Sequence, residues 1–555
     1  MVWTLLVLAC GAADDSVPTV SDTEEDTAPY VPPPVDTETD TDTDADTDAD
    51  ADTDTDTDTD TDTDTAVTPI CTDTIAVERL RYDHKVLGID PKADVPREQG
   101  PGLGLGDLDG DGDIDALLTI RGTPARILRN DGGSLVIDDS GTLDGGPLPE
   151  ANAVALADLD DDGDLDGVLS TPQGGNDVVF INEGGLAFTT LAILPGSDGE
   201  RMTPSFGDAN GDGWLDLYVG GYVHDFNPTE PQIGDGASYY LRDPGAGFID
   251  RSHTLPPEAV DGMSFQGTWV DYDSDGDLDL YISNDCYADG YCPAPPVLLE
   301  NDGAGNLTRA EGCYCDASFS AMGSHVQDID DNGLPDLFVT NFGPAQAFLN
   351  LGDDTFAEGS TALGLVPTHP SSFISWGSAW ADLDQDADPD LVVGFGPTDP
   401  SVFSFGMLYQ PDAVFFNNGD GTYLDVTKTI SLDEMGVTRA VAIGDIDGDR
   451  RPEVWMAGHL YVVVYAFDGG CPAGIALTLH AGPGNPHGIG TRVDVTIDGD
   501  TDTHWMLPST TFSSSAPVLY LGLGEAVAAD LLVTWPDGTT TARSGVAPGD
   551  LHLTR

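Results

Sequence analysis

Residues 206–220 read FGDANGDGWLDLYVG, a nine-residue acidic loop followed directly by an apolar, strand-like run. The loop fits the pattern D-x-[DN]-x-[DN]-x-x-x-[DE], which occurs seven times at intervals of 50 to 63 residues. The seven copies begin at Asp107, Asp158, Asp208, Asp271, Asp328, Asp382 and Asp445. A repeat of this length with strand-like runs is typical of propeller blades. The sequence therefore predicts an all-β fold, a seven-bladed β-propeller.

The spacing inside each loop suits calcium. Oxygens at positions 1, 3 and 5, a backbone carbonyl at 7 and a carboxylate at 9 can surround Ca²⁺ at about 2.3–2.6 Å. An EF-hand would also need Glu at position 12, but that position is always apolar here: Leu118, Leu169, Val219, Ile282, Val339, Val393 and Met456. We therefore expect up to seven Ca²⁺ ions, held by loops inside β-hairpins.

The predicted ligands are the residues at positions 1, 3, 5, 7 and 9 of each loop, with position 7 contributing its carbonyl. They are Asp107, Asp109, Asp111, Asp113 and Asp115; Asp158, Asp160, Asp162, Asp164 and Asp166; Asp208, Asn210, Asp212, Trp214 and Asp216; Asp271, Asp273, Asp275, Asp277 and Asp279; Asp328, Asp330, Asn332, Leu334 and Asp336; Asp382, Asp384, Asp386, Asp388 and Asp390; and Asp445, Asp447, Asp449, Arg451 and Glu453. The sixth loop has Ala387 in place of the turn glycine, and the seventh has Arg450 there, followed by Arg451. Two adjacent cations should weaken the seventh site, and the occupancy of both loops stays open.

Each repeat continues into strands with an Asn/Gly hairpin, such as LRNDGGSL or FNNGDGTY. With Phe206-Gly207-Asp208 and Leu217-Tyr218-Val219-Gly220 around a metal loop, residues 71–470 resemble the FG-GAP repeats of integrin α-chain propellers. The seventh repeat lacks its fourth strand, and residues 75–89 (IAVERLRYDHKVLGI) are the candidate to supply it. A propeller closed in this way has no exposed sheet edge.

Residues 471–555 lack the loop pattern. They contain NPHGIGTRV at 485–493, SSS at 513–515, LGLG at 521–524 and VTWPDG at 533–538, and in this order they resemble the ASPIC/UnbV domain. The resemblance implies a small β domain on an extracellular, calcium-binding propeller protein that has no assigned catalytic activity. We expect Trp535 to fill the core of that domain.

The amino terminus predicts export. Residues 2–9 (VWTLLVLA) lead into Cys10 and resemble a bacterial lipobox, with a signal peptide at 1–9 and lipidation of Cys10. Residues 11–65 hold 21 acidic residues and neither Lys nor Arg, so we expect residues 10–70 to form a disordered tether. The expected location is the bacterial outer membrane or cell surface as a lipoprotein, or secretion.

Six further cysteines agree with export: Cys71, Cys286, Cys292, Cys313, Cys315 and Cys471. Cys71 precedes the candidate closing strand and Cys471 follows the last strand of repeat 7, so these two should form a disulfide that locks the ring. The other four should cluster on the loops of blade 4. A bond across Cys313-Tyr314-Cys315 would be strained, which favours pairing between Cys286 or Cys292 and Cys313 or Cys315.

Charge narrows the possible partners. The chain has 99 Asp and Glu against 19 Lys and Arg, a net charge of −80, which excludes nucleic-acid binding by the body of the protein. No catalytic motif is recognisable. Long loops on the face opposite the calcium loops predict a site for a glycan or an extracellular protein there, and its candidate residues are Tyr222, His224, Tyr239, Tyr240, Phe403, Phe405 and Tyr409. These side chains could instead plug the channel, and a carbohydrate-active enzyme or a structural surface-layer component remains an alternative.

Overall fold

The computed structural model describes residues 71–83, 101–120, 122–172, 174–195, 199–223, 236–286, 292, 294–313, 319–367, 373–397, 410–432, 435–458 and 461–555. All seven acidic loops lie inside these ranges. The predicted signal peptide, Cys10 and the tether up to residue 70 lie outside them, and so do His224, Phe403, Phe405, Tyr409 and Cys315.

Seven sheets share one plan of four antiparallel strands, and we call them blades 1 to 7. Blade 1 contains β2 (Gly102–Gly106), β3 (Asp115–Thr119), β4 (Arg126–Asn130) and β5 (Leu135–Asp138). Blade 2 contains β8 (Ala153–Ala157), β9 (Asp166–Ser170), β10 (Asp177–Asn182) and β11 (Ala187–Leu194), with the short β6 (Thr142–Leu143) and β7 (Gly146–Pro147) added at its outer edge. Blade 3 contains β12 (Glu200–Gly207), β13 (Asp216–Tyr222), β14 (Ser238–Asp243) and β15 (Gly247–Asp250).

The remaining blades follow the same order. Blade 4 contains β16 (Ser264–Val270), β17 (Asp279–Asn284), β18 (Val297–Asn301) and β19 (Leu307–Arg309). Blade 5 contains β20 (Ala321–Gln327), β21 (Asp336–Asn341), β22 (Gln346–Asn350) and β23 (Phe356–Glu358). Blade 6 contains β24 (Ser375–Ala381), β25 (Asp390–Phe395), β27 (Ala413–Asn417) and β28 (Tyr423–Asp425). Blade 7 contains β30 (Thr438–Gly444), β31 (Glu453–Gly458), β32 (Tyr461–Gly470) and the amino-terminal β1 (Thr72–Asp83).

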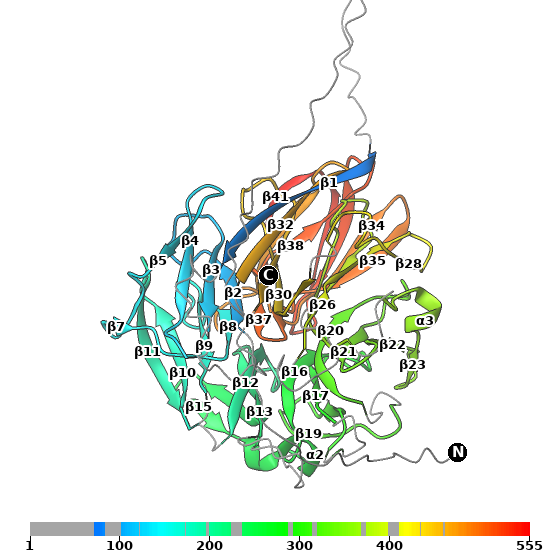
Figure 1. The fold of residues 1–555 in the computed structure, drawn as a ribbon. Coiled ribbons are helices and arrows are strands. Elements are labelled where there is room, and N and C mark those ends of the chain that lie inside the picture. The colour runs from blue at the N-terminus through cyan, green and yellow to red at the C-terminus, as the bar shows by residue number, and fades with distance from the viewer. Residues whose placement is uncertain are drawn as a thin grey trace, which may run out of the picture. The chain divides into compact units, whose positions relative to one another are not determined.

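The blades form a closed, propeller-like ring (Figure 1). The first strands of successive blades contact one another in chain order, from β2 through β8, β12, β16, β20 and β24 to β30, and β30 contacts β2 again. In the part of the chain that the structure describes, helices are few and short, namely η1 (Ser252–Thr254), α2 (Pro257–Val260) and α3 (Ser360–Leu363). Within the described residues, no helix has the length and apolar character that a membrane crossing requires.

Packing between blades explains the apolar runs that follow the loops. Successive side chains of a strand point to opposite faces of its sheet. In β17, Leu280 and Ile282 pack with residues of blade 3 such as Tyr239, whereas Tyr281 packs with residues of blade 5 such as Phe348. Because both faces of each sheet are covered, the second strand is apolar at nearly every position.

Blade 7 is closed by the amino-terminal strand, as the sequence predicts. β1 lies antiparallel to β32, with Val77 opposite Phe467 and Tyr82 opposite Val462. Cys71 and Cys471 form a disulfide at the end of this pair, with their Cα atoms 4.0 Å apart. The bond joins residues 400 positions apart in the chain, so it links the two ends of the ring.

The predicted pairing of the blade 4 cysteines is wrong. Cys286 is bonded to Cys292, six residues away and with a Cα–Cα distance of 4.4 Å, rather than to Cys313 or Cys315. The spacing of the four cysteines alone does not reveal this pairing. Cys313 is also disulfide-bonded, and its side chain is buried in the core beside blade 4.

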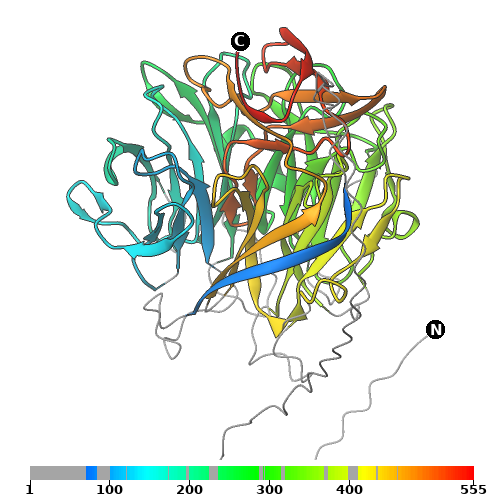
Figure 2. The same ribbon diagram turned by 90° about the horizontal axis from the view of Figure 1, so that it is seen from above.

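Residues 471–555 build two further sheets within the same compact unit as the ring. One sheet contains β33 (Ile475–His480), β38 (Leu519–Leu521) and β41 (Gly549–Thr554), and the other contains β34 (Arg492–Ile497), β35 (Asp500–Trp505), β39 (Ala529–Thr534) and β40 (Thr540–Val546). Trp535 is buried in the core between them, as predicted. Figure 2 shows these strands, in orange and red, gathered on one side of the ring.

One segment of this region fills the centre of the ring. The hairpin of β36 (Ser509–Thr510) and β37 (Ser513–Ser514) joins the inner edge of blade 1, where β37 runs parallel to β2. Between them, Phe512 is fully buried in a central cluster that takes residues from the first strand of every blade. The ring centres of Phe265 and Trp376 lie 6.1 and 6.3 Å from that of Phe512. The carboxyl-terminal region thus plugs the channel.

Candidate metal centres

The acidic loops connect the first and second strands of all seven blades. Position 1 directly follows the first strand, and position 9 is the first residue of the second. Carboxylate oxygens from positions 1, 3 and 9 converge to within 4.8 Å of one another in the loops that begin at Asp107, Asp158, Asp271, Asp328 and Asp382. The predicted loop-in-hairpin placement is therefore confirmed, and five of the loops bring together three acidic groups that can hold a metal ion.

The carboxylate at position 9 is held in place by the backbone. In the first loop, Asp115 accepts the N–H of Leu108 at 2.9 Å and that of Asn130 at 2.8 Å. The same two kinds of bond recur around Asp166, Asp216, Asp279, Asp336 and Asp390, and Glu453 accepts the N–H of Ile446 at 2.6 Å. All seven side chains are buried. A ligand oriented in this way needs little ordering when an ion binds.

The carboxylate at position 1 closes the loop by accepting the N–H of position 6, at 3.0 Å between Asp107 and Gly112. Position 6 has a positive φ in every loop, including 90° at Ala387 and 69° at Arg450. Ala387 and Arg450 make the same bond to their position 1 carboxylates, at 2.9 and 2.7 Å. The sixth and seventh loops thus keep the geometry despite the missing glycine, at the modest cost of a left-handed non-glycine residue.

The side chains at positions 5 and 7 of the loop make different contacts. At position 5, Asp111 accepts the N–H of Asp113 at 3.0 Å, and equivalent bonds recur in the other loops. The position 7 side chain of Asp113 turns to the following hairpin and accepts the N–H of Gly132 at 2.6 Å. Arg451 directs its guanidinium to the carbonyls of Gly469 and Cys471, so this cation anchors the ring closure instead of lying in its own loop.

Burial and the proximity of other carboxylates destabilise the charged form of these side chains when no cation is bound. Burial, with a smaller contribution from neighbouring carboxylates, raises the pKa of Asp115 to about 6, that of Asp166 to about 7 and that of Asp336 to about 8. The Oδ1 atoms of Asp271, Asp330 and Asp384 are buried without a hydrogen-bond partner. Such atoms fit a hard cation that takes oxygen ligands.

The metal-free protein should therefore lose stability as pH rises. A carboxyl whose folded pKa is about 8, such as Asp336, contributes its full stability below its ordinary pKa near 3.8 and loses it as pH rises through 8. We expect thermal melting in EDTA to be several degrees higher at pH 5 than at pH 8. With saturating Ca²⁺ the order should reverse, because protons compete with the ion for the same oxygens. Equal pH dependence with and without Ca²⁺ would contradict this.

An asparagine that joins four of the loops to the next blade was not recognised from the sequence. Asn130, Asn182, Asn301 and Asn350 end third strands, and each donates its side-chain amide to the position 2 carbonyl of the preceding blade's loop, at 2.6–2.9 Å. Arg242 serves the same purpose in blade 3. The recurrent Asn before each Gly hairpin was the available signal. Its meaning was hidden because the acceptor lies 74 to 316 residues away.

The described members of the predicted ligand face are not exposed. Tyr239 and Tyr240 lie in β14 and are 0% and 2% exposed, inside two different cores between blades. Tyr222 packs in the central cluster and donates its hydroxyl to Asp285 at 2.7 Å. The expectation that these three aromatic side chains lie at the surface is therefore wrong. Tyr222 still belongs to β13, and β14 begins before Tyr239, so all three lie in strands whose two faces are buried.

The fold and loops define a propeller-like protein with acidic hairpin loops, and the comparisons specify it further. The FG-GAP-like repeat family matches residues 158–219, 328–393 and 402–456, and the ASPIC and UnbV family matches residues 482–554. The chain thus carries FG-GAP-like repeats followed by an ASPIC and UnbV domain, as its sequence motifs indicated.

Similar proteins are recognisable at low identity. Cartilage acidic protein 1 of Homo sapiens is 23% identical over 512 residues, which covers 74% of this chain and 72% of that protein. Its counterpart in Mus musculus is 24% identical over 503 residues, covering 72% and 73%. Among solved structures, an Agrocybe aegerita lectin that recognises terminal N-acetylglucosamine aligns with a TM-score of 0.39 and 15% identity, over 66% of this chain and 85% of that one. An exotype rhamnogalacturonan lyase aligns with a TM-score of 0.36 and 13% identity, over 72% and 75%.

Proposed function

We propose that this protein is an extracellular calcium-binding protein whose metal ions hold the ring rigid while another surface binds a partner. The observation that carries the proposal is the convergence of three carboxylates in each of five loops, with the same backbone support in all seven. Calcium at these loops would supply the positive charge that the clustered oxygens need. The chain's own residues do the rest, since position 1 closes the loop and position 9 ties it to the second and third strands.

Export to an oxidising compartment is supported by the disulfides. Cys71–Cys471 and Cys286–Cys292 are the kind of bond that persists outside the cytosol. Anchoring through a lipid on Cys10 remains part of the proposal and rests on the residues before it. Replacement of Cys10 by Ser should release the protein from the membrane fraction if the anchor is real.

We infer the surface that binds the partner from the parts of the ring that the carboxyl-terminal region covers. That region contacts the third, fourth, sixth and seventh loops, through Leu215, Leu278, Gln385 and Asp445, and its hairpin fills the channel. The face away from the loops is therefore the larger surface left for a glycan or an extracellular protein. A carbohydrate-active enzyme on that face, or a purely structural surface component, is the alternative.

A glycan-array and protein-capture screen with calcium-loaded protein tests this proposal. A binding protein should give saturable binding without turnover, and a variant with Phe403→Ala and Phe405→Ala should bind more weakly at an unchanged melting temperature. Product formation from a bound polysaccharide would favour the enzyme, whereas self-association alone would favour the structural role. Calcium content is measured separately by elemental analysis, because absence of bound calcium would overturn the first half of the proposal whatever the screen shows.

A further inference from the structure

The sixth loop, residues 382–390, differs from the other six in its exposure. Each of the other loops contains at least two exposed residues around positions 4 to 6, such as Asp111 in the first and Asp162 in the second. The sixth loop contains none, and its position 4 residue, Gln385, is fully buried. This loop is therefore less accessible to solvent than the other six, although Asp384, Asp386, Ala387 and Asp388 remain partly exposed.

The carboxyl-terminal region forms the cover. The side-chain oxygen of Gln385 accepts the N–H of Gly474 at 2.9 Å, and its backbone carbonyl accepts the N–H of Gly524 at 3.0 Å. Gly522 lies so close that an added Cβ would be 1.8 Å from Oδ2 of Asp382. The N–H of Cys471, which belongs to the ring-closing disulfide, is bonded to the carbonyl of Asp384 at 2.7 Å. Two separate segments of the carboxyl-terminal region, residues 471–474 and 522–524, thus close over one loop.

The covered loop concentrates negative charge. Asp382 and Asp390 are 3% and 1% exposed, and their carboxylates face those of Asp384 and Asp386. Oδ1 of Asp384 is buried with no hydrogen-bond partner. Solvent stabilises these buried and half-buried charges only weakly, so they favour a cation held within the loop. The other loops have fully exposed residues through which bulk water can complete the coordination of an ion, whereas the sixth loop has only partly exposed ones.

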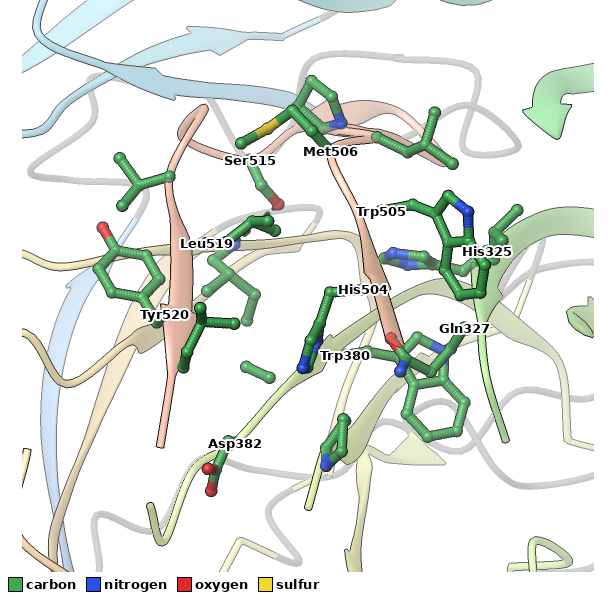
Figure 3. A pocket seen from close by; sticks show the side chains of 18 of the residues that line it. His325, Gln327, Trp380, Asp382, His504, Trp505, Met506, Ser515, Leu519 and Tyr520 are labelled. Atoms are coloured by element: carbon green, nitrogen blue, oxygen red, sulfur yellow. Dashed lines mark hydrogen bonds between the residues drawn. The ribbon is translucent and has the colours of Figure 1, made fainter. Parts of the chain in front are cut away.

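A cavity beside the loop offers space for the missing ligands. It has a volume of about 90 Å³ and lies between blades 5 and 6 and the carboxyl-terminal region, with Asp382 on its lining (Figure 3). His325, Trp380 and His504 also line it. A water needs roughly 10–15 Å³ of such volume, so several waters fit next to Asp382. An ion in the sixth loop can reach its full coordination number without the cover being displaced.

We propose that the sixth loop is a closed calcium site, whose ion is retained beneath the carboxyl-terminal region and leaves only when that region lifts. The proposal rests on calcium binding as proposed above. The loops of blades 1 and 2 hold exposed acids, Asp111 in the first and Asp161 and Asp162 in the second, so their ions exchange freely. One ion is thus retained beneath the carboxyl-terminal region and exchanges slowly, and the others respond to the calcium concentration outside.

The test follows the release of calcium from the loaded full-length protein into excess chelator, by elemental analysis of protein separated at successive times. We expect one ion per chain to leave at least about 100-fold more slowly than the fastest ones, because local opening must precede its release. The double substitution Asp384→Asn and Asp386→Asn should abolish the slow ion. Release of all ions in a single fast phase, or a slow ion that survives this double substitution, would overturn the proposal.

A substitution at Gln385 distinguishes the effect of opening the cover from the effect of removing metal ligands. Gln385→Asn keeps every carboxylate and a residue that tolerates the left-handed φ of 64°, but its side chain is too short to hold Gly474. The slow release should become about tenfold faster, as expected for loss of one buried hydrogen bond, at unchanged calcium content. Ser274→Asn is the matched control, because Ser274 occupies position 4 of the fourth loop with φ 61° and an exposed side chain, and it should leave the slow phase unchanged. Protein that contains no calcium before chelation would instead refute the proposed function.

Discussion

Removal of calcium with EDTA at neutral pH should lower the unfolding temperature by about 10 °C or more, the largest effect that we expect for this protein. Each loop brings together buried carboxylates that repel one another once the cation is gone. Linkage gives about 2.7 kcal/mol for each site at an ion concentration 100 times its dissociation constant. Differential scanning calorimetry in EDTA and in millimolar Ca²⁺ measures the difference directly. Identical melting in the two solutions would show that the loops do not depend on the metal.

Single substitutions locate this stabilisation. Asp273→Asn alters position 3 of the fourth loop, so it should remove one bound ion and reduce the gain from Ca²⁺ by about 2.7 kcal/mol under the same conditions. Asp550→Asn is the control, since Asp550 is an exposed carboxylate in β41 outside every loop. It changes the net charge by the same amount and should leave both the calcium content and the gain in stability unchanged. Equal effects of the two substitutions would indicate general charge screening.

Loss of the disulfide Cys71–Cys471 should have the second largest effect. The bond closes a loop of 400 residues, for which the chain-entropy relation gives about 5 kcal/mol as an upper value. β1 and β32 stay paired along most of their length in the double variant Cys71→Ser and Cys471→Ser, so we expect a folded protein with a lower melting temperature. Calorimetry without reducing agent compares it with the unchanged protein.

The disulfide Cys286–Cys292 provides an internal control. It spans only six residues, and the entropy of loop closure grows with the logarithm of loop length. The double variant Cys286→Ser and Cys292→Ser should therefore lose clearly less stability than the variant that opens the ring. A larger loss from this local bond would mean that the ring is held by strand pairing alone, with no contribution from its covalent closure.

The loops and the ring closure were predictable because their determinants are local or lie at the ends of a repeat. Nine consecutive residues fix each loop, since position 1 bonds to position 6 and position 9 bonds to position 2. The missing strand of blade 7 showed as a gap in a regular pattern, and the cysteines at 71 and 471 stood at both sides of that gap. The spacing of residues within a loop or a repeat is therefore enough to predict each of these features.

The exposure of the tyrosines and the pairing of the blade 4 cysteines were not predictable in the same way. Tyr239 and Tyr240 were assigned to a loop because the chain between β13 and β14 is long and polar, but both belong to the strand that follows it. Cys286 and Cys292 are bonded to each other, a pairing that the spacing of the four cysteines does not determine. In both cases the outcome depends on where a loop ends, which is the least constrained feature of a repeat.

The sequence by itself determined the repeated loops, the oxygen ligands that they offer, the β architecture and the closure of the ring. Only the tertiary structure decided that Phe512 fills the channel, that an asparagine ties four of the loops to the next blade, and that the sixth loop is covered. These features join residues far apart in the chain, as when the N–H of Leu103 bonds to the carbonyl of Phe512 at 3.0 Å. A repeat pattern in the sequence cannot predict such contacts, because they depend on how two segments with unrelated sequence patterns pack against each other.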